Sequence, residues 1–71
     1  MQKWEYRVLQ VMDGGVWDAY CREFQKCPHI GFGCAHVAQW YLPQLGDDGW
    51  EVVGFARDDD SLWYTLRRPK P

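Results

Sequence analysis

In three segments of this chain the side chains alternate between two faces, as in β-strands, and both faces carry large apolar groups. This feature constrains the fold more than any other. In Lys3–Met12 the alternation gives two apolar sets, one of Trp4, Tyr6 and Val8 and the other of Leu9 and Val11. Trp50–Arg57 and Leu62–Arg68 repeat the pattern, and Asp58–Ser61 between them predicts a hairpin loop. A sheet of such strands needs cover on both faces.

Two intervening segments have helical spacing. Val16–Lys26 places Val16, Tyr20 and Phe24 on one stripe, which predicts a short helix that ends before Pro28. Ala35–Leu45 is the main predicted helix, and its apolar face comprises Ala38, Tyr41, Leu42 and Leu45.

These segments predict an α+β class fold, a small β-α-β-β domain. A three-stranded, mainly antiparallel sheet would pair the first strand with the last, one main helix would pack on it, and a short helical insert would occupy residues 13–34. The whole chain, 1–71, forms one domain. Since one helix covers only one face, we expect a second copy of the chain to cover the other, giving a homodimer.

Composition narrows the class of protein. The chain has 71 residues, 46% of them hydrophobic, and five Trp, four Tyr and three Phe offer ample area for a core, which excludes a disordered chain. The net charge of −2 disfavours nucleic acid as a partner. No apolar run is long enough for a membrane span, and because the first residues lack a hydrophobic region we expect no signal peptide. The odd number of cysteines, three, favours reduced thiols and a cytoplasmic location.

Three stretches together resemble a known family. They are WEYRVL at Trp4–Leu9, LPQLGDDGWEVVGF at Leu42–Phe55 and YTLRRP at Tyr64–Pro69, and they are similar to the small bacterial family DUF4177. The resemblance implies a compact β-α-β-β domain, often self-associating, with no assigned activity or catalytic residues. Its most specific positions have structural roles here. Gly46 would close the helix in the left-handed conformation, Gly49 would turn the chain, and Trp50 would anchor helix to sheet.

The segment 13–36 departs from that family because it is longer and holds every cysteine and histidine of the chain. Five candidate metal ligands lie within it, namely Cys21, Cys27, His29, Cys34 and His36. Thiolate and imidazole are the ligands that zinc prefers, but the usual C-x₂₋₄-C and H-x₃₋₅-H spacings are absent. Buried or surface thiols without a ligand are the simpler interpretation. A catalytic Cys–His pair would also lack a visible Asp or Asn to orient the histidine.

The sequence therefore predicts a non-catalytic, homo-oligomeric binding or accessory module whose partner is unknown, with no cofactor. One alternative is a zinc-stabilised domain that uses the Cys21–His36 segment. Another is a binder of small molecules with an aromatic pocket. The candidate ligand or interface residues are Trp4, Tyr6, Trp17, Trp40, Trp63 and Tyr64.

Overall fold

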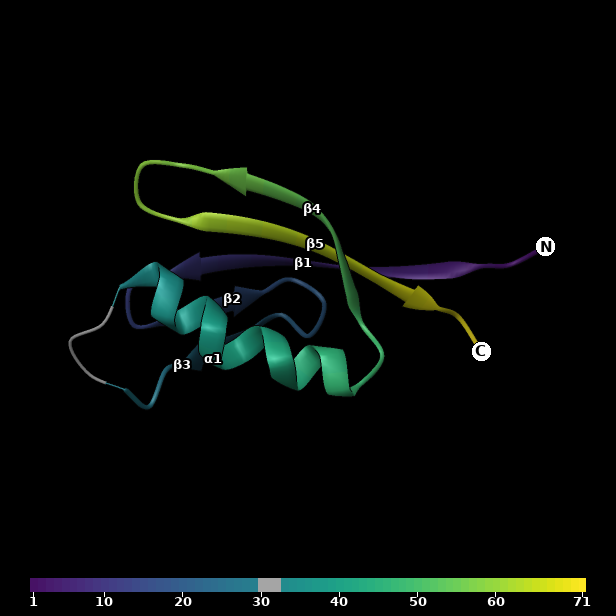
Figure 1. The fold of residues 1–71 in the computed structure, drawn as a ribbon, viewed down its shortest axis with the longest axis horizontal. Helices are drawn as coiled ribbons and strands as arrows, with labels where there is room; N and C mark the ends of the chain where they lie inside the picture. The colour runs from purple at the N-terminus through teal and green to yellow at the C-terminus, as the bar shows by residue number, and fades with distance from the viewer. Residues whose placement is uncertain (30–32) are drawn as a thin grey trace.

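A computed structural model describes residues 1–29 and 33–71, and it has two layers, a five-stranded sheet and one helix (Figure 1). The elements in chain order are β1 (Trp4–Met12), β2 (Gly15–Asp18), β3 (Glu23–Lys26), α1 (Cys34–Asp47), β4 (Glu51–Arg57) and β5 (Leu62–Pro69). The strand order is β3-β2-β1-β5-β4, and every neighbouring pair is antiparallel. The class is therefore α+β, with β1 at the centre of the sheet.

The pairing of the first strand with the last is confirmed. β1 and β5 run antiparallel from Trp4 opposite Pro69 to Val11 opposite Leu62. Beyond the strands, the backbone N–H of Lys70 donates to the carbonyl of Lys3 at 2.8 Å. The two ends of the chain consequently leave the sheet on the same side (Figure 1). The predicted terminal hairpin is also present, since β4 and β5 pair around residues 58–61.

The prediction of a three-stranded sheet with a helical insert is wrong. The segment predicted as the helix Val16–Lys26 forms β2, a turn and β3, which add two strands beside β1. Burial alternates along β2, where Val16 and Asp18 are buried and Trp17 is exposed, as in a strand covered on one face. The turn that follows contains Arg22 in the left-handed region, with φ of 58°. Eight residues of the expected insert 13–34, at 15–18 and 23–26, are therefore strands of the sheet, and residues 30–32 lie outside the described residues.

Gly15 explains locally why this segment pairs as strands. A Cβ built at this position would lie 2.4 Å from Cζ of Phe24 and 2.5 Å from the carbonyl oxygen of Gln25. Both atoms belong to the neighbouring strand β3, so the ring of Phe24 and the β3 backbone occupy the space that any side chain would need. The glycine permits β2 and β3 to approach each other at this point.

The main helix is confirmed, although it begins one residue before and ends two residues after the predicted Ala35–Leu45. Gly46 lies inside α1, so the prediction that it closes the helix in the left-handed conformation is wrong. That conformation belongs to Gly49, with φ of 89°, where the chain turns toward β4. Trp50 follows directly and is buried, as expected for an anchor between the helix and the sheet.

The hydrophobic core lies between α1 and the β1–β2 half of the sheet. It consists of the buried residues Leu9, Val11, Val16, Cys27, Val37, Ala38, Tyr41, Leu45, Trp50 and Leu66. In the described part of the chain, no helix has the length and apolar character needed to cross a membrane. The packing leaves two regions of the sheet without full cover. One is the entire face opposite α1. The other is the β4 side of the face that carries α1, where Val52 and Phe55 are exposed and Leu62 and Tyr64 of β5 are only partly buried against the core.

Candidate functional site

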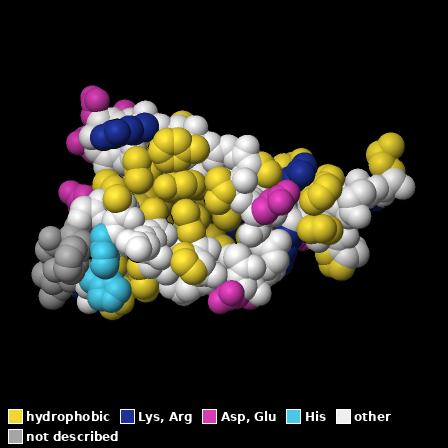
Figure 2. Space-filling view, in the orientation of Figure 1, with side chains coloured by type: hydrophobic (Ala, Val, Ile, Leu, Met, Phe, Trp, Pro, Cys, Tyr) yellow, Lys and Arg dark blue, Asp and Glu magenta, His cyan; other side chains and the backbone are white. Residues whose placement is uncertain are grey.

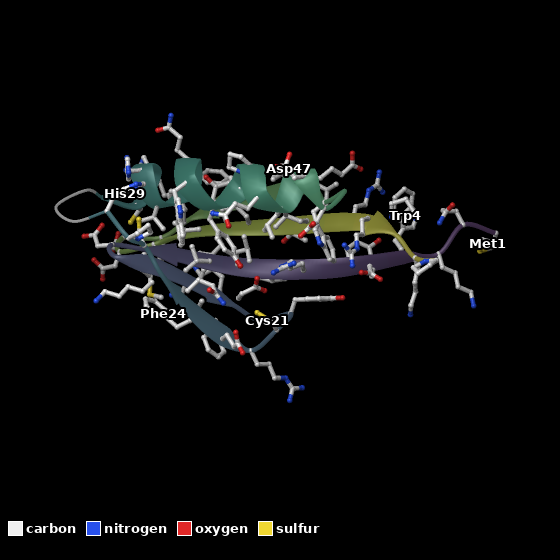
Figure 3. All side chains as sticks on the ribbon, turned by 90° about the horizontal axis from the view of Figure 1, so that it is seen from below. Met1, Trp4, Cys21, Phe24, His29 and Asp47 are labelled. Atoms are coloured by element: carbon white, nitrogen blue, oxygen red, sulfur yellow. The ribbon has the colours of Figure 1, made fainter. Side chains whose placement is uncertain are left out.

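The sheet face opposite α1, called the open face below, carries a row of aromatic side chains. Cross-strand partners share a face, and the register aligns Trp63 with Gln10, Gln10 with Trp17, and Trp17 with Phe24 across four strands. In Figure 3 Phe24 points away from the sheet on the side opposite α1. The row therefore crosses the open face from β5 to β3.

The open face is apolar and accessible. Its exposed fractions are 57% for Tyr6, 52% for Phe24 and 40% for both Val8 and Trp17. Charged side chains lie at one end of the open face. There the Arg67 guanidinium stacks 4.1 Å from the Trp4 ring centroid and pairs with Glu51 at 2.8 Å. Isolated exposed hydrophobic residues are normal on a small protein, but a contiguous aromatic group marks an interaction surface.

On the helix side, a buried ionic network joins β1, β2 and α1. The Asp18 carboxylate is fully buried, and its Oδ2 accepts hydrogen bonds from Arg7 Nε at 2.8 Å and from the Tyr41 hydroxyl at 3.0 Å. Its Oδ1 accepts from the backbone N–H of Tyr20 at 3.0 Å. Every buried side-chain nitrogen or oxygen of the described residues has such a partner. A carboxylate satisfied in this way holds strands and helix together and is inaccessible to a substrate.

The network raises the pKa of Tyr41 to about 12, through burial and through the hydrogen bond that its hydroxyl donates to Asp18. The folded protein therefore retains a phenol proton that the unfolded chain releases near its ordinary pKa of about 10. We expect the free energy of unfolding to fall as pH rises from 10 to 12, and this contribution to be intact below pH 10. Urea unfolding at successive pH values checks this, with Tyr41→Phe as the reference. Parallel curves for the two proteins would contradict it.

The five predicted metal ligands separate into three places. Cys27, His29 and His36 lie together, with Cys27 Sγ 3.8 Å from His29 Nδ1, and the two imidazoles share a hydrogen bond of 2.9 Å between His29 Nδ1 and His36 Nε2. Cys34 Sγ donates instead to Asp13 Oδ1 at 3.3 Å. Cys21 lies in the β2–β3 turn, far from His29 in Figure 3. Within residues 1–29 and 33–71, no three potential ligands are arranged to hold a metal ion.

Cys34 is poorly suited to act as a nucleophile. Burial and the hydrogen bond to Asp13 raise the pKa of its thiol, which keeps it protonated, whereas a catalytic cysteine needs a lowered pKa. Both the zinc-stabilised alternative and the absence of catalysis stay predictions.

A cleft of about 590 Å³ lies where the β4–β5 hairpin meets the start of α1. Its lining is mixed, with the acidic groups Asp13, Asp59 and Asp60 beside Arg57 and the apolar side chains of Met12 and Leu62. The sequence predicts a hairpin loop at Asp58–Ser61 and contains no signal for a cleft beside it. None of the six predicted aromatic residues lines it. Four of them, Trp4, Tyr6, Trp17 and Trp63, share the open face by register, whereas Tyr64 is on the helix side and Trp40 on the helix itself.

Comparison of the chain with models of protein families, with curated proteins and with solved structures gives no match. The resemblance to DUF4177 therefore stays a prediction.

Proposed function

We propose that this protein is a non-catalytic interaction module that self-associates through the open face of its sheet. The observation that carries the proposal is the row Trp63–Gln10–Trp17–Phe24, aromatic except for Gln10, with the exposed Tyr6 and Val8 beside it. In the proposed dimer the two sheets pack face to face about 10 Å apart, as in a β-sandwich, and their side chains interdigitate.

The size of the open face supports a second copy as the occupant. At a rise of about 3.4 Å per residue and a strand spacing of about 4.8 Å, the five strands project over roughly 500 Å². The protruding side chains make the accessible area larger than this projection, which brings it near the roughly 800 Å² that each partner buries in a standard interface. The charge at its end is already paired, since Arg67 and Glu51 neutralise each other within one chain.

The outer surface of α1 is a poorer candidate for the dimer. Its exposed positions include Gln39, Gln44 and Asp47, which are polar. Contact through them would bury groups that need new hydrogen-bond partners, whereas contact through the open face buries mainly rings and aliphatic groups.

The proposal is tested by replacing Val8, in the central strand of the open face, with lysine. Val8 is 40% exposed, so the lysine reaches solvent in a monomer, but a dimer would have to bury two ammonium groups. We expect light scattering on a size-exclusion column to give a dimer mass for the wild type and a monomer mass for Val8→Lys. The matched control is Phe55→Lys, which places the same charge on β4 on the helix side and should remain dimeric.

Circular dichroism on both variants distinguishes dissociation from unfolding. A wild-type protein that is monomeric at every concentration would overturn the proposal, and so would a Val8→Lys variant that keeps its fold and the dimer mass.

A further inference from the structure

The face of the sheet that carries α1 is only half covered. α1 packs on β1 and β2, while the β4–β5 hairpin extends beside it without a helix above (Figure 1). Two strands span about 10 Å, which is close to the width of one α-helix with its side chains. The uncovered strip therefore has room for one further helix beside α1.

This strip is apolar, and we define it by Val52, Phe55, Leu62 and Tyr64. Phe55 pairs with Tyr64, Tyr64 with Leu9, and Leu62 with Val11. Since Leu9 and Val11 are buried in the core under α1, these partners share the helix side of the sheet. Phe55 is 59% and Val52 46% exposed, whereas Leu62 and Tyr64 are half-buried against the core, and Figure 2 shows a continuous hydrophobic area here.

Exposed acidic side chains lie at both ends of the strip. Asp47 and Asp48 stand at the end of α1, and the hairpin loop contributes Asp58, Asp59 and Asp60. Two cations lie near these ends, Arg57 at the end of β4 and Arg68, which donates to the Asp48 carbonyl at 3.0 Å and pairs with Glu5. The five aspartates outnumber them, so the net charge at the two ends of the strip is negative. A ligand with positive charge at both ends would be attracted, and a nucleic acid or an anionic membrane would be repelled.

Two other occupants fit less well. Strand addition to the free edge of β4 would require a regular ladder, but a register shift between Val52 and Gly54 interrupts the strand. A second copy of this chain would bring its own aspartates against the same acidic ends and would present the polar outer surface of α1.

We propose that the β4–β5 strip is a docking site for an amphipathic, positively charged helix of a partner protein. The helix has about four turns, matching the 14 residues of α1 beside it. Its apolar residues follow the i, i+3, i+4, i+7 spacing and face Phe55 and Tyr64, and its Lys or Arg residues flank them and reach the aspartates at each end. The site is on the side of the sheet opposite the proposed dimer interface, so the two proposals stand independently.

The probe is a fluorescent 18-residue peptide with leucine at the i, i+3, i+4, i+7 positions and lysine at the flanking ones. Binding is followed by fluorescence anisotropy and by amide shifts of the ¹⁵N-labelled protein. We expect saturable binding that weakens with added salt, with shift changes in β4, β5 and α1. Phe55→Ser should weaken the affinity by about tenfold or more, whereas Tyr6→Ser, an equivalent change on the open face, should leave it unchanged.

A second variant, Asp59→Asn with Asp60→Asn, keeps the strip intact and removes only charge. It should weaken binding severalfold and reduce the salt dependence. A peptide with glutamate in place of every lysine should not bind. The proposal is overturned if the lysine peptide fails to saturate, if Phe55→Ser binds it as the wild type does, if the glutamate peptide binds equally well, or if the shift changes map to the open face.

Discussion

Replacing Asp18 with alanine is expected to destabilise the domain by about 3–5 kcal/mol, the cost of removing one partner from a buried ion pair. The substitution leaves the Arg7 guanidinium, whose side chain is 12% exposed, without its carboxylate. It also removes the acceptor of the Tyr41 hydroxyl and of the Tyr20 N–H. Three elements lose their shared contact at once, so the loss should exceed that of a single hydrogen bond, about 1 kcal/mol.

Urea unfolding followed by tryptophan fluorescence measures the loss at Asp18. Because a domain of this size has a small total stability, a variant that is already unfolded by circular dichroism also meets the prediction. The control is Glu51→Gln, which breaks the exposed pair between Glu51 and Arg67 and should cost less than about 1 kcal/mol. Equal losses for the two variants would show that the Asp18 network contributes no more than a surface pair.

Replacing Leu66 with alanine is the second large effect, with an expected loss of about 2–5 kcal/mol. Leu66 lies in β5, is 1% exposed and belongs to the core cluster. Its removal takes apolar area from the core and leaves a cavity that the β1 and β4 backbones on either side can only partly close.

The matched control for Leu66 is its own cross-strand partner on β4, Val52, which is 46% exposed. Val52→Ala should cost less than about 1 kcal/mol, because most of its surface already contacts water. The same unfolding experiment measures both variants. Similar losses at the two positions would mean that β5 does not form part of the core.

The strands at the two ends of the chain were predictable because their alternation is long and regular. The strands in the segment around Val16 were not predictable. Its apolar residues at 16, 20 and 24 fit a helix by spacing, yet they also fit two four-residue strands joined by a turn. The decisive residue is Asp18, which is buried in β2 only because Arg7 and Tyr41, distant in sequence, meet it there. A tertiary partnership of this kind overrides local periodicity.

The candidate metal site was predicted from residue type, because five cysteine and histidine residues lie within sixteen positions of the sequence. In the structure the extended strand β3 lies between Cys21 and Cys27, and Cys34 donates to Asp13. By contrast, Trp4 and Tyr6 were named as interface candidates from alternation alone. The structure places them on one face with Trp17, which the sequence had assigned to the insert, and their role in an interface stays a prediction.

The strand order has a kinetic consequence. β4 precedes β5 in the chain, yet its one neighbour in the sheet is β5. A hairpin of these two strands alone would be marginal in water, so β4 gains lasting order only once β5 has joined β1 across some fifty intervening residues. That closure is the slow, non-local step. We therefore expect the sheet to assemble outward from β1, and β4, which carries Val52 and Phe55 of the strip, to join it only after β5.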